Sequence, residues 1–466
     1  MSEGLDNYLE QPLIIVIFGI SGDLSQRKLL PALYHLFKHQ QLPSAIKIVG
    51  VSRQAIPVTD VYGDLHTRVH GSDFDAAIVE RIQTNTMMFQ MDLDSSADYD
   101  KLLEELRVVS DELGPGASRL YYLSIPSQAF VSVVHHLGEA GHHEPFADDG
   151  ERPRLLVEKP FGYDTASAET LVHAADEHFG EQQTFRIDHY LAKETAQNIL
   201  TFRFQNPLFQ SIWNSRHIES IHIMAYETIG IENRVTFYEQ TGALRDILQS
   251  HLMQLLALIT MEKPAALESR DIHKSKLRLL QSIDTIQPDD VASCAVRGQY
   301  DNYKKEVNNT DSRVETFARL HLSIDNEQWR GVGVTIETGK ALHEKCSQII
   351  VRFRANEDAP GANELSFRVQ PREGITLSLQ AKRPGLTKDT ETVKMEFDYD
   401  RAFYGQHGEA YERVIIDAVR GDQSLFATAE EVLTSWQIIE NVLKQWADSD
   451  NGLVLYPVGT PADEIQ

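Results

Sequence analysis

The clearest indication of the architecture of the N-terminal part is Leu13-Ile14-Ile15-Val16-Ile17-Phe18-Gly19-Ile20-Ser21-Gly22-Asp23-Leu24. Its first six residues form a continuous apolar run rich in β-branched side chains, which is typical of a strand buried on both faces of a parallel sheet. Apolar spacing over residues 28–37 then predicts a helix. A glycine turn between a buried strand and a helix lets the backbone approach a pyrophosphate. We therefore expect a dinucleotide-binding turn, although Ser21 and Leu24 depart from G-x-G-x-x-G and a strand–helix turn without a ligand is the alternative.

The alternation of strands and helices continues through the first 180 residues and then gives way to a different pattern. Residues 45–51, 120–123 and 154–157 predict further short strands, and residues 98–113 predict a helix between them. Residues 1–182 are therefore expected to form a doubly wound α/β, Rossmann-like domain. Helical patterns and many short alternating stretches follow, so residues 183–466 are expected to form a larger α+β domain with an extended, mostly antiparallel sheet packed on helices.

Composition limits the function classes. The 466 residues carry a formal net charge of −25, which disfavours nucleic-acid and anionic membrane partners. Apolar runs are too short to span a bilayer, and the acidic N-terminus does not resemble a secretory signal. The two cysteines, Cys294 and Cys346, have neither pairing nor metal-ligand spacing. We expect a cytoplasmic protein without a metal, whose anionic ligands bind at local positive clusters.

The end of the second predicted strand bears on the cofactor. An NAD site usually has Asp or Glu there, to bind the ribose 2′-hydroxyl. Here the strand runs into Ser52-Arg53, and Arg27 in the first turn could join Arg53. A planar guanidinium suits a phosphate, so NADP is expected and NAD is the weaker alternative. Both arginines could instead be solvated surface groups.

The segment Arg186-Ile187-Asp188-His189-Tyr190-Leu191-Ala192-Lys193-Glu194 concentrates donors for a dianion. His189, Tyr190 and Lys193 could converge on a phosphate, although a surface helix can be this charged for solubility alone. A cofactor turn and a separate anion site in one chain suggest a dehydrogenase that acts on a phosphorylated substrate.

Two more segments place lysines near strand ends. Lys159, in Glu158-Lys159-Pro160-Phe161-Gly162, follows a predicted strand at the end where α/β sheets bind ligands, and its bond to Pro160 is a candidate for the cis form. In Gly339-Lys340-Ala341-Leu342-His343-Glu344-Lys345, Lys340 and Lys345 could complete an anion site. A plain strand-exit turn and solvated loop charge are the respective alternatives.

A strongly apolar helical stretch contains His251, which could be a buried structural histidine or a catalytic one. Asp246 lies five residues earlier, which is roughly 140° around an α-helix axis. The two side chains are therefore not expected to form a single stripe, and spacing alone leaves their role undecided.

Together these segments resemble the glucose-6-phosphate dehydrogenase family. The match runs in order from Ile14 to about Tyr456 and includes Gly242–His251, Met261-Glu262-Lys263-Pro264, Arg368-Val369-Gln370-Pro371 and Ala410-Tyr411-Glu412-Arg413. The resemblance implies a nucleotide-binding domain with a sheet domain, assembled as homodimers or homotetramers. It also implies oxidation of glucose 6-phosphate to the 6-phospho-lactone, which is the first step of the oxidative pentose phosphate pathway.

The resemblance also implies roles for individual residues. His251 matches the base that takes the C1 hydroxyl proton, and Asp188 matches the carboxylate that orients it. The positions that match substrate contacts are Lys159, His189, Tyr190, Lys193, Glu227, Asp246, Lys340 and Lys345. The positions that match cofactor contacts are Gly19, Ser21, Gly22, Asp23, Leu24, Arg27, Arg53 and Lys159. Ser250, Ala192 and Lys345 stand where the family usually has Asn, Gly and Arg, and each of these departures could change the affinity for the substrate.

Two other functions compete with this one. An enzyme of the glucose–fructose oxidoreductase superfamily would share the nucleotide-binding domain and a Glu-Lys-Pro turn, but would not need residues 186–194 to bind phosphate. A non-catalytic sugar-phosphate sensor would keep the fold without needing both Asp188 and His251.

Overall fold

The computed structural model describes residues 7–69, 74–147, 150–355, 361–386, 388–403, 409–448 and 452–466. The chain divides into two compact units, each with its own sheet. The first unit comprises residues 1–162, 166–192 and 408–429, and the second comprises residues 163–165, 193–407 and 430–466.

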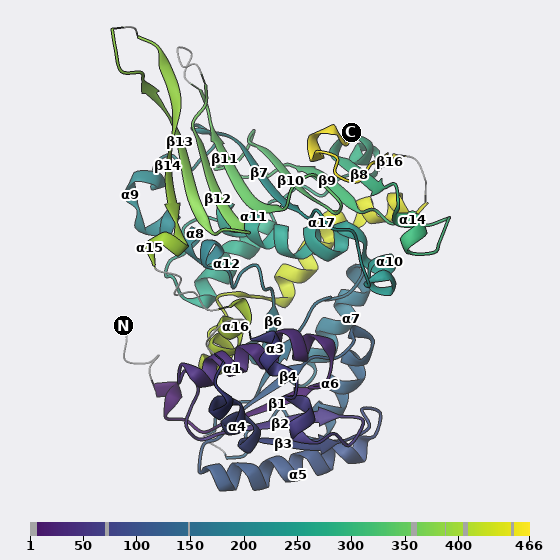
Figure 1. Cartoon of the computed structure of the whole chain (residues 1–466). Coiled ribbons are helices and arrows are strands. Elements are labelled where there is room, and N and C mark those ends of the chain that lie inside the picture. Colours follow the sequence, from purple (N-terminus) through teal and green to yellow (C-terminus); the bar gives the residue numbers. More distant parts are fainter. Residues whose placement is uncertain are drawn as a thin grey trace. The chain divides into compact units, whose positions relative to one another are not determined.

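The first unit is built on a seven-stranded sheet in the order β15-β6-β5-β4-β1-β2-β3 (Figure 1). Every pair is parallel except β15 with β6. The strand order reverses between β1 and β4, which confirms the expected doubly wound arrangement. The strands are β1 (Leu13–Phe18), β2 (Ile46–Ser52), β3 (Thr86–Gln90), β4 (Ser118–Leu123), β5 (Arg154–Val157), β6 (Thr184–Ile187) and β15 (Phe426–Ala427).

The position of β1 between two layers of helices explains why its sequence is continuously apolar. Ile15 and Ile17 pack into one buried cluster with helices α1 and α16, whereas Ile14 and Val16 pack into another with α5 and α6. Because successive side chains of a strand point to opposite faces, helices on both faces demand apolar residues at every position. The helical segments are η1 (Asn7–Leu9), η2 (Ser25–Leu29), α1 (Leu30–Lys38), α2 (Val58–Val61), α3 (Leu65–Arg68), α4 (Ala76–Thr84), α5 (Ser96–Leu113), η3 (Ser127–Ala129), α6 (Phe130–Glu139), α7 (Thr165–Asp176), η4 (Glu181–Gln183) and α16 (Ala410–Arg420).

The second unit is built on a nine-stranded sheet in the order β14-β13-β12-β11-β7-β10-β9-β8-β16. Only the pairs β10–β7 and β16–β8 are parallel among these strands, so the expected, mostly antiparallel sheet is confirmed. The strands are β7 (Ile218–Tyr226), β8 (Ala295–Tyr300), β9 (Phe317–Leu322), β10 (Gly333–Gly339), β11 (Cys346–Phe353), β12 (Glu364–Gln370), β13 (Gly374–Lys382), β14 (Thr390–Asp398) and β16 (Leu453–Tyr456).

Helices cover one face of this second sheet. Helices α8, α11, α12 and α17 run along that face in Figure 1, and η5 packs against β7, β9 and β10. The helical segments are α8 (Glu194–Gln205), α9 (Pro207–Gln210), α10 (Val235–Ala243), η5 (Leu244–Leu252), α11 (Met253–Thr260), α12 (Ser269–Leu280), η6 (Pro288–Asp290), α13 (Val291–Cys294), α14 (Tyr303–Glu306), α15 (Tyr399–Ala402), α17 (Ala429–Asp448) and η7 (Ala462–Glu464). Among the described residues, no helix combines the length and apolar character that crossing a bilayer requires.

The division of the chain differs from a single break between residues 182 and 183. Strand β6 hydrogen-bonds to β5, so the first unit continues to residue 192. Helix α16 returns to the first unit because its apolar residues, including Val414 and Ile415, join the cluster that contains β1. The Arg154 guanidinium also donates a 2.6 Å hydrogen bond to the Val419 carbonyl at the end of this helix.

Candidate active site

The predicted glycine turn directly follows β1 and fits closely against the end of β4. Gly19 has a φ of +77°, and a Cβ atom on it would lie 2.3 Å from the carbonyl oxygen of Ser124. The Gly22 amide and the Ser25 hydroxyl each donate a 2.9 Å hydrogen bond to the Gly19 carbonyl. Only glycine tolerates this approach, because the φ is left-handed and the neighbouring backbone is too close. The turn therefore leads the chain directly into a helix at the reversal of strand order, as a pyrophosphate site requires.

The two arginines expected near the 2′ position differ in their surroundings. Arg27 lies one turn into the helix and forms an exposed ion pair with Asp23, at 2.7 Å between Nε and Oδ1. Arg53 follows β2, the neighbour of β1, and its side chain is exposed. Its backbone carbonyl accepts a 3.2 Å hydrogen bond from the Gln90 side chain. Because the Asp23 carboxylate already offsets the charge of Arg27, Arg53 is the better placed of the two to bind a phosphate.

The segment that contains Lys159 leaves β5 at the same edge of the sheet. The Lys159-Pro160 bond is cis. The preceding Glu158 accepts a 2.5 Å hydrogen bond from the Tyr122 hydroxyl of β4 and another from Tyr411 of α16. Burial raises the pKa of Glu158 to about 7, against the opposing effects of the Tyr122 hydroxyl and the Lys159 charge. Glu158 thus anchors the turn that presents Lys159 beyond the strand end.

Asp188 immediately follows β6, two strands from β4 in the same sheet. It is only 2% exposed, and its Oδ1 accepts a 2.9 Å hydrogen bond from the Tyr190 amide. This local bond is an Asx turn, which fixes the carboxylate and bends the chain after the strand. The rings of His189 and Tyr190 are 5.1 Å apart, so two of the expected phosphate donors are adjacent.

Asp246 and His251 lie on η5, which is a π-helix over Leu244–Leu252. The expected separation of 140° is therefore wrong, because it assumed α-helical geometry. In a π-helix, hydrogen bonds run from residue i to residue i+5, so residues five apart are stacked one turn above the other. Asp246 is 7% exposed and His251 is 0% exposed, so both side chains are buried. The π-helix places a carboxylate and an imidazole on the same side of one helix.

The start of this π-helix depends on Glu315, which was not among the predicted site residues. Gly242 has a φ of +62°, and a Cβ atom there would lie 2.3 Å from Glu315 Oε1. The Glu315 carboxylate accepts a 2.9 Å hydrogen bond from the Leu244 amide, and its backbone carbonyl accepts one of 2.9 Å from Ala243. Burial raises the pKa of Glu315, and Arg245 opposes that shift. Glu315 thereby sets the direction in which the chain enters the helix containing His251.

Glu227 and Lys340 follow the adjacent parallel strands β7 and β10. Their side chains form an ion pair, and backbone hydrogen bonds of 2.9 Å link Glu227 to Gly339 and Leu342. Lys340 is buried, and its Nζ lies 5.4 Å from the centre of the Tyr238 ring. A buried lysine paired with a carboxylate at a strand end is a fixed charge that can bind an anionic or hydroxylated ligand.

Tyr238 connects this pair to the π-helix. Burial raises the pKa of Tyr238 well above its usual value, and the nearby charges of Asp246 and Glu315 raise it further. The Asp246 carboxylate also lies 3.8 Å from the guanidinium of Arg234, at the start of α10. In the second unit, Lys340 and Asp246 therefore both lie near one buried tyrosine, and Glu227 is joined to them through its ion pair with Lys340.

The remaining candidates are less enclosed. Lys193 belongs to the second unit, immediately precedes α8 and is partly buried. Lys345 is exposed just before β11, in contrast to the buried Lys340.

The predicted residues thus form two sets. In the first unit, the glycine turn, Arg53, Lys159 and Asp188 all lie at the carboxyl ends of parallel strands, which share one edge of the sheet. In the second unit, Glu227, Lys340, Asp246 and His251 lie on two adjacent strands and the helix packed against them. Residues such as Tyr122 and Tyr238 were not predicted, because a tyrosine within an apolar stretch looks like an ordinary core residue. Glu158 had a signal, since it stands beside Lys159 at a strand end.

Known families match both parts of the chain. Residues 16–198 match the family described as glucose-6-phosphate dehydrogenase, NAD binding domain, and residues 200–464 match glucose-6-phosphate dehydrogenase, C-terminal domain. The glucose-6-phosphate 1-dehydrogenase of Chlamydia muridarum is 37% identical over 469 residues, which cover 94% of this chain and 90% of that protein. The protein of the same name from Rhizobium meliloti is 34% identical, with 97% of this chain and 94% of that protein covered.

Solved structures agree with the sequence matches. A glucose-6-phosphate dehydrogenase in complex with its substrate glucose-6-phosphate has a TM-score of 0.90 and 32% identity, with 97% of this chain and 96% of that chain covered. A levoglucosan dehydrogenase in complex with NADH and levoglucosan has a TM-score of 0.53 and 10% identity, and so shares the fold alone. With both family domains matched in order over nearly its whole length, the chain belongs to the glucose-6-phosphate dehydrogenase family.

Proposed function

We propose that this protein is a glucose-6-phosphate 1-dehydrogenase, which oxidises C1 of D-glucose 6-phosphate to 6-phospho-D-glucono-1,5-lactone. The observation that supports this most strongly is the 32% identity and TM-score of 0.90 to a solved family member bound to glucose 6-phosphate. Every residue that the family resemblance assigns to proton transfer is present, as Asp188 and His251. The levoglucosan dehydrogenase shares only the fold, at 10% identity, and so adds no support for another substrate.

In the proposed reaction, His251 accepts the proton of the C1 hydroxyl. A buried imidazole is suited to this step, because water does not compete for its nitrogen. Asp188 holds the imidazole in its productive orientation and stabilises the cation that forms. A nicotinamide cofactor, when bound, would supply the acceptor for the hydride that leaves C1. The fixed position of the Asp188 carboxylate, through the Tyr190 amide, supports an orienting role.

Substrate recognition is proposed to use the two ends of the sugar. His189, Tyr190 and Lys193 donate to the phosphate, since charge-assisted hydrogen bonds to a dianion are strong. Glu227 and Asp246 accept hydrogen bonds from sugar hydroxyls. The cations of Lys159, Lys340 and Lys345 are proposed to contribute to the same site, with the buried Lys340 contributing more than the exposed Lys345.

The cofactor is proposed to be NADP, with NAD as a weaker alternative. The close approach of Gly19 to Ser124 fits a backbone cradle for a pyrophosphate, and residues 19–24 would hold it. Arg53 would bind the 2′-phosphate, with Arg27 as a second cation. The absence of an acidic residue after β2 removes the usual partner of the NAD ribose.

Replacing Arg53 by alanine is expected to reduce kcat/KM with NADP by about tenfold or more, while kcat/KM with NAD changes little. The reason is that a charge-assisted hydrogen bond, worth about 1.5–3 kcal/mol, is lost only with the phosphorylated cofactor. Steady-state kinetics with each cofactor would measure this. Arg152→Ala is a matched control, because that exposed arginine precedes β5 at the opposite edge of the sheet. Equal losses with both cofactors would dismiss Arg53 as the phosphate ligand.

The direct test of the proposed function is to mix purified protein with cofactor and each sugar, and to measure the absorbance of the reduced cofactor that forms. We expect turnover with glucose 6-phosphate and NADP, and much lower kcat/KM with unphosphorylated glucose. Equal efficiency with free glucose would favour the glucose–fructose oxidoreductase alternative. Binding of glucose 6-phosphate without any cofactor reduction would favour a sugar-phosphate sensor.

The protein is further proposed to act in the cytoplasm as a homodimer or homotetramer, assembled through the sheet of the second unit. Strands β11 and β12 support this, because residues that are only half buried alternate along them with fully buried ones. Among the described residues, the helices lie along one face of this sheet, and the half-buried side chains of the other face are suited to pairing with a second copy. Light scattering of the purified protein would measure the assembly.

A further inference from the structure

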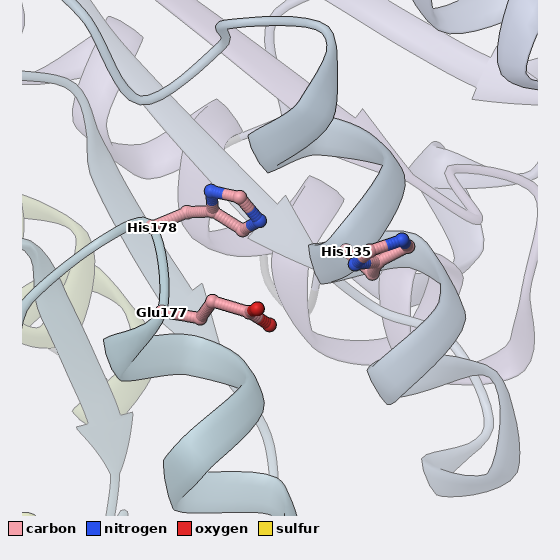
Figure 2. Close-up of side chains that lie close together, drawn as sticks. All are labelled: His135, Glu177 and His178. Atoms are coloured by element: carbon pink, nitrogen blue, oxygen red, sulfur yellow. The ribbon is translucent and has the colours of Figure 1, made fainter.

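Three potential metal ligands converge in the first unit, away from every residue assigned above. They are His135 on α6 and the pair Glu177 and His178 just after α7. One ligand atom from each lies within 4.8 Å of the other two. Figure 2 shows the Glu177 carboxylate and the His178 ring extending toward His135. Two imidazoles and a carboxylate in such a group form a donor set that proteins commonly use for Zn²⁺.

The position of the His178 ring depends on a glycine. A Cβ atom on Gly138 would lie 2.0 Å from His178 Cδ2 and 2.1 Å from Cγ, so the ring rests directly on the backbone of α6. Gly138 lies within the helix at a φ that any residue could adopt, and glycine there costs about 1 kcal/mol relative to alanine. The glycine is therefore needed for the approach of the imidazole rather than for backbone geometry.

A fourth donor lies beside these three. Glu139 stands four residues after His135 on α6, so both side chains project from the same side of the helix. Its Oε1 lies 4.0 Å from His178 Nε2. That nitrogen is buried and makes no hydrogen bond to any described residue. A buried ring nitrogen that faces carboxylates but bonds to neither is well disposed to accept a metal ion.

We propose that His135, Glu177 and His178, with Glu139 as a further ligand, form a binding site for a divalent transition metal, of which Zn²⁺ fits best. Zn–N and Zn–O bonds of about 2.0–2.2 Å place tetrahedral ligand atoms roughly 3.4 Å apart. The three ligand atoms lie within 4.8 Å of one another, so metal binding would draw the exposed His135 and Glu177 side chains closer together. Mg²⁺ and Ca²⁺ prefer oxygen ligands, so a site with two imidazoles discriminates against both.

The location of the site predicts what the metal does. Helices α6 and α7 follow β4 and β5 and run back toward the amino ends of these strands, so their last turns lie at the sheet edge opposite the glycine turn. A metal there would join two helices without contacting the proposed cofactor-binding residues. Binding should therefore stabilise the first unit and leave kcat and KM unchanged, because a ligand that binds only the folded state raises its stability.

The test is titration calorimetry of Zn²⁺ into the whole, chelator-treated protein, with thermal unfolding as a second readout. We expect one equivalent of Zn²⁺ to bind and to raise Tm. His135→Ala and Glu177→Gln should each weaken Zn²⁺ binding at least tenfold, since even outer-sphere partners are worth about 10–100-fold in affinity. Both residues are exposed, so these variants should fold normally.

His173→Ala is the matched control, because His173 is exposed on α7 but lies outside the cluster. It should leave Zn²⁺ affinity and the Tm shift unchanged, and Mg²⁺ should produce no shift in any variant. Absence of Zn²⁺ binding would overturn the proposal. So would equal affinity in His135→Ala, Glu177→Gln and the unaltered protein, since the metal would then be bound by other histidines of the chain.

Discussion

His251→Ala is expected to lower kcat by about 10²–10⁴-fold, which is the usual contribution of a general base. The imidazole is fully buried on the π-helix, so no solvent-exposed group can readily replace it. KM for glucose 6-phosphate should change much less than kcat, because the base acts on the proton that moves during the reaction. Steady-state measurements of cofactor reduction would give both kcat and KM.

The control for this experiment separates catalysis from folding. His251→Asn keeps much of the side-chain volume but cannot accept the proton, so it should show a similar loss in kcat with a near-normal Tm. His217→Asn removes an exposed histidine at the start of β7 and should leave kcat unchanged. A kcat close to that of the unaltered enzyme in His251→Asn would remove His251 from the role of base.

Lys193→Ala is expected to reduce the preference for glucose 6-phosphate over glucose by about 1.5–3 kcal/mol, or roughly 10- to 150-fold in the ratio of kcat/KM values. Lys193 immediately precedes α8, and its side chain is proposed to donate to the phosphate dianion. Free glucose has no phosphate, so its kcat/KM should change little. Measuring kcat/KM for both sugars isolates this effect from any general loss of activity.

Lys263→Ala is the matched control for Lys193→Ala, since Lys263 is an exposed lysine of the same unit. It should leave the preference intact. An unchanged preference in Lys193→Ala would show that the phosphate is bound by other groups.

Much of the fold could be predicted from local patterns because the local and tertiary demands agree. Strand β1 is apolar at every position since both of its faces are covered, and the predicted bounds of 13–18 and 154–157 match β1 and β5. Strand β7 was missed although it lies near the middle of the second sheet. Its sequence, Ile218–Tyr226, has two consecutive polar residues, Glu219 and Ser220, near its start, and they interrupt the apolar alternation that resumes only at Ile221.

The geometry of the candidate site was harder to predict from the sequence than the fold. α-Helical spacing predicted that Asp246 and His251 lie on different sides of their helix. That prediction was wrong because the segment is a π-helix, and nothing in the local sequence reveals this. Glu315 lies about 70 residues beyond the helix that it caps, so only the fold brings it to Gly242. The His135–Glu177–His178 cluster could not be predicted either, because His135 is distant in sequence from the other two residues and only the fold brings them together.

A double-mutant cycle on Asp188 and His251 would show whether the two residues act as one catalytic unit. If the carboxylate acts through the imidazole, Asp188→Asn should lower kcat strongly in the unaltered enzyme and hardly at all in His251→Asn, because residues that act as one unit are not additive. Rapid measurement of cofactor reduction in the four proteins gives the coupling. Equal effects of Asp188→Asn in both backgrounds would show that the two residues act independently and would contradict the proposed mechanism.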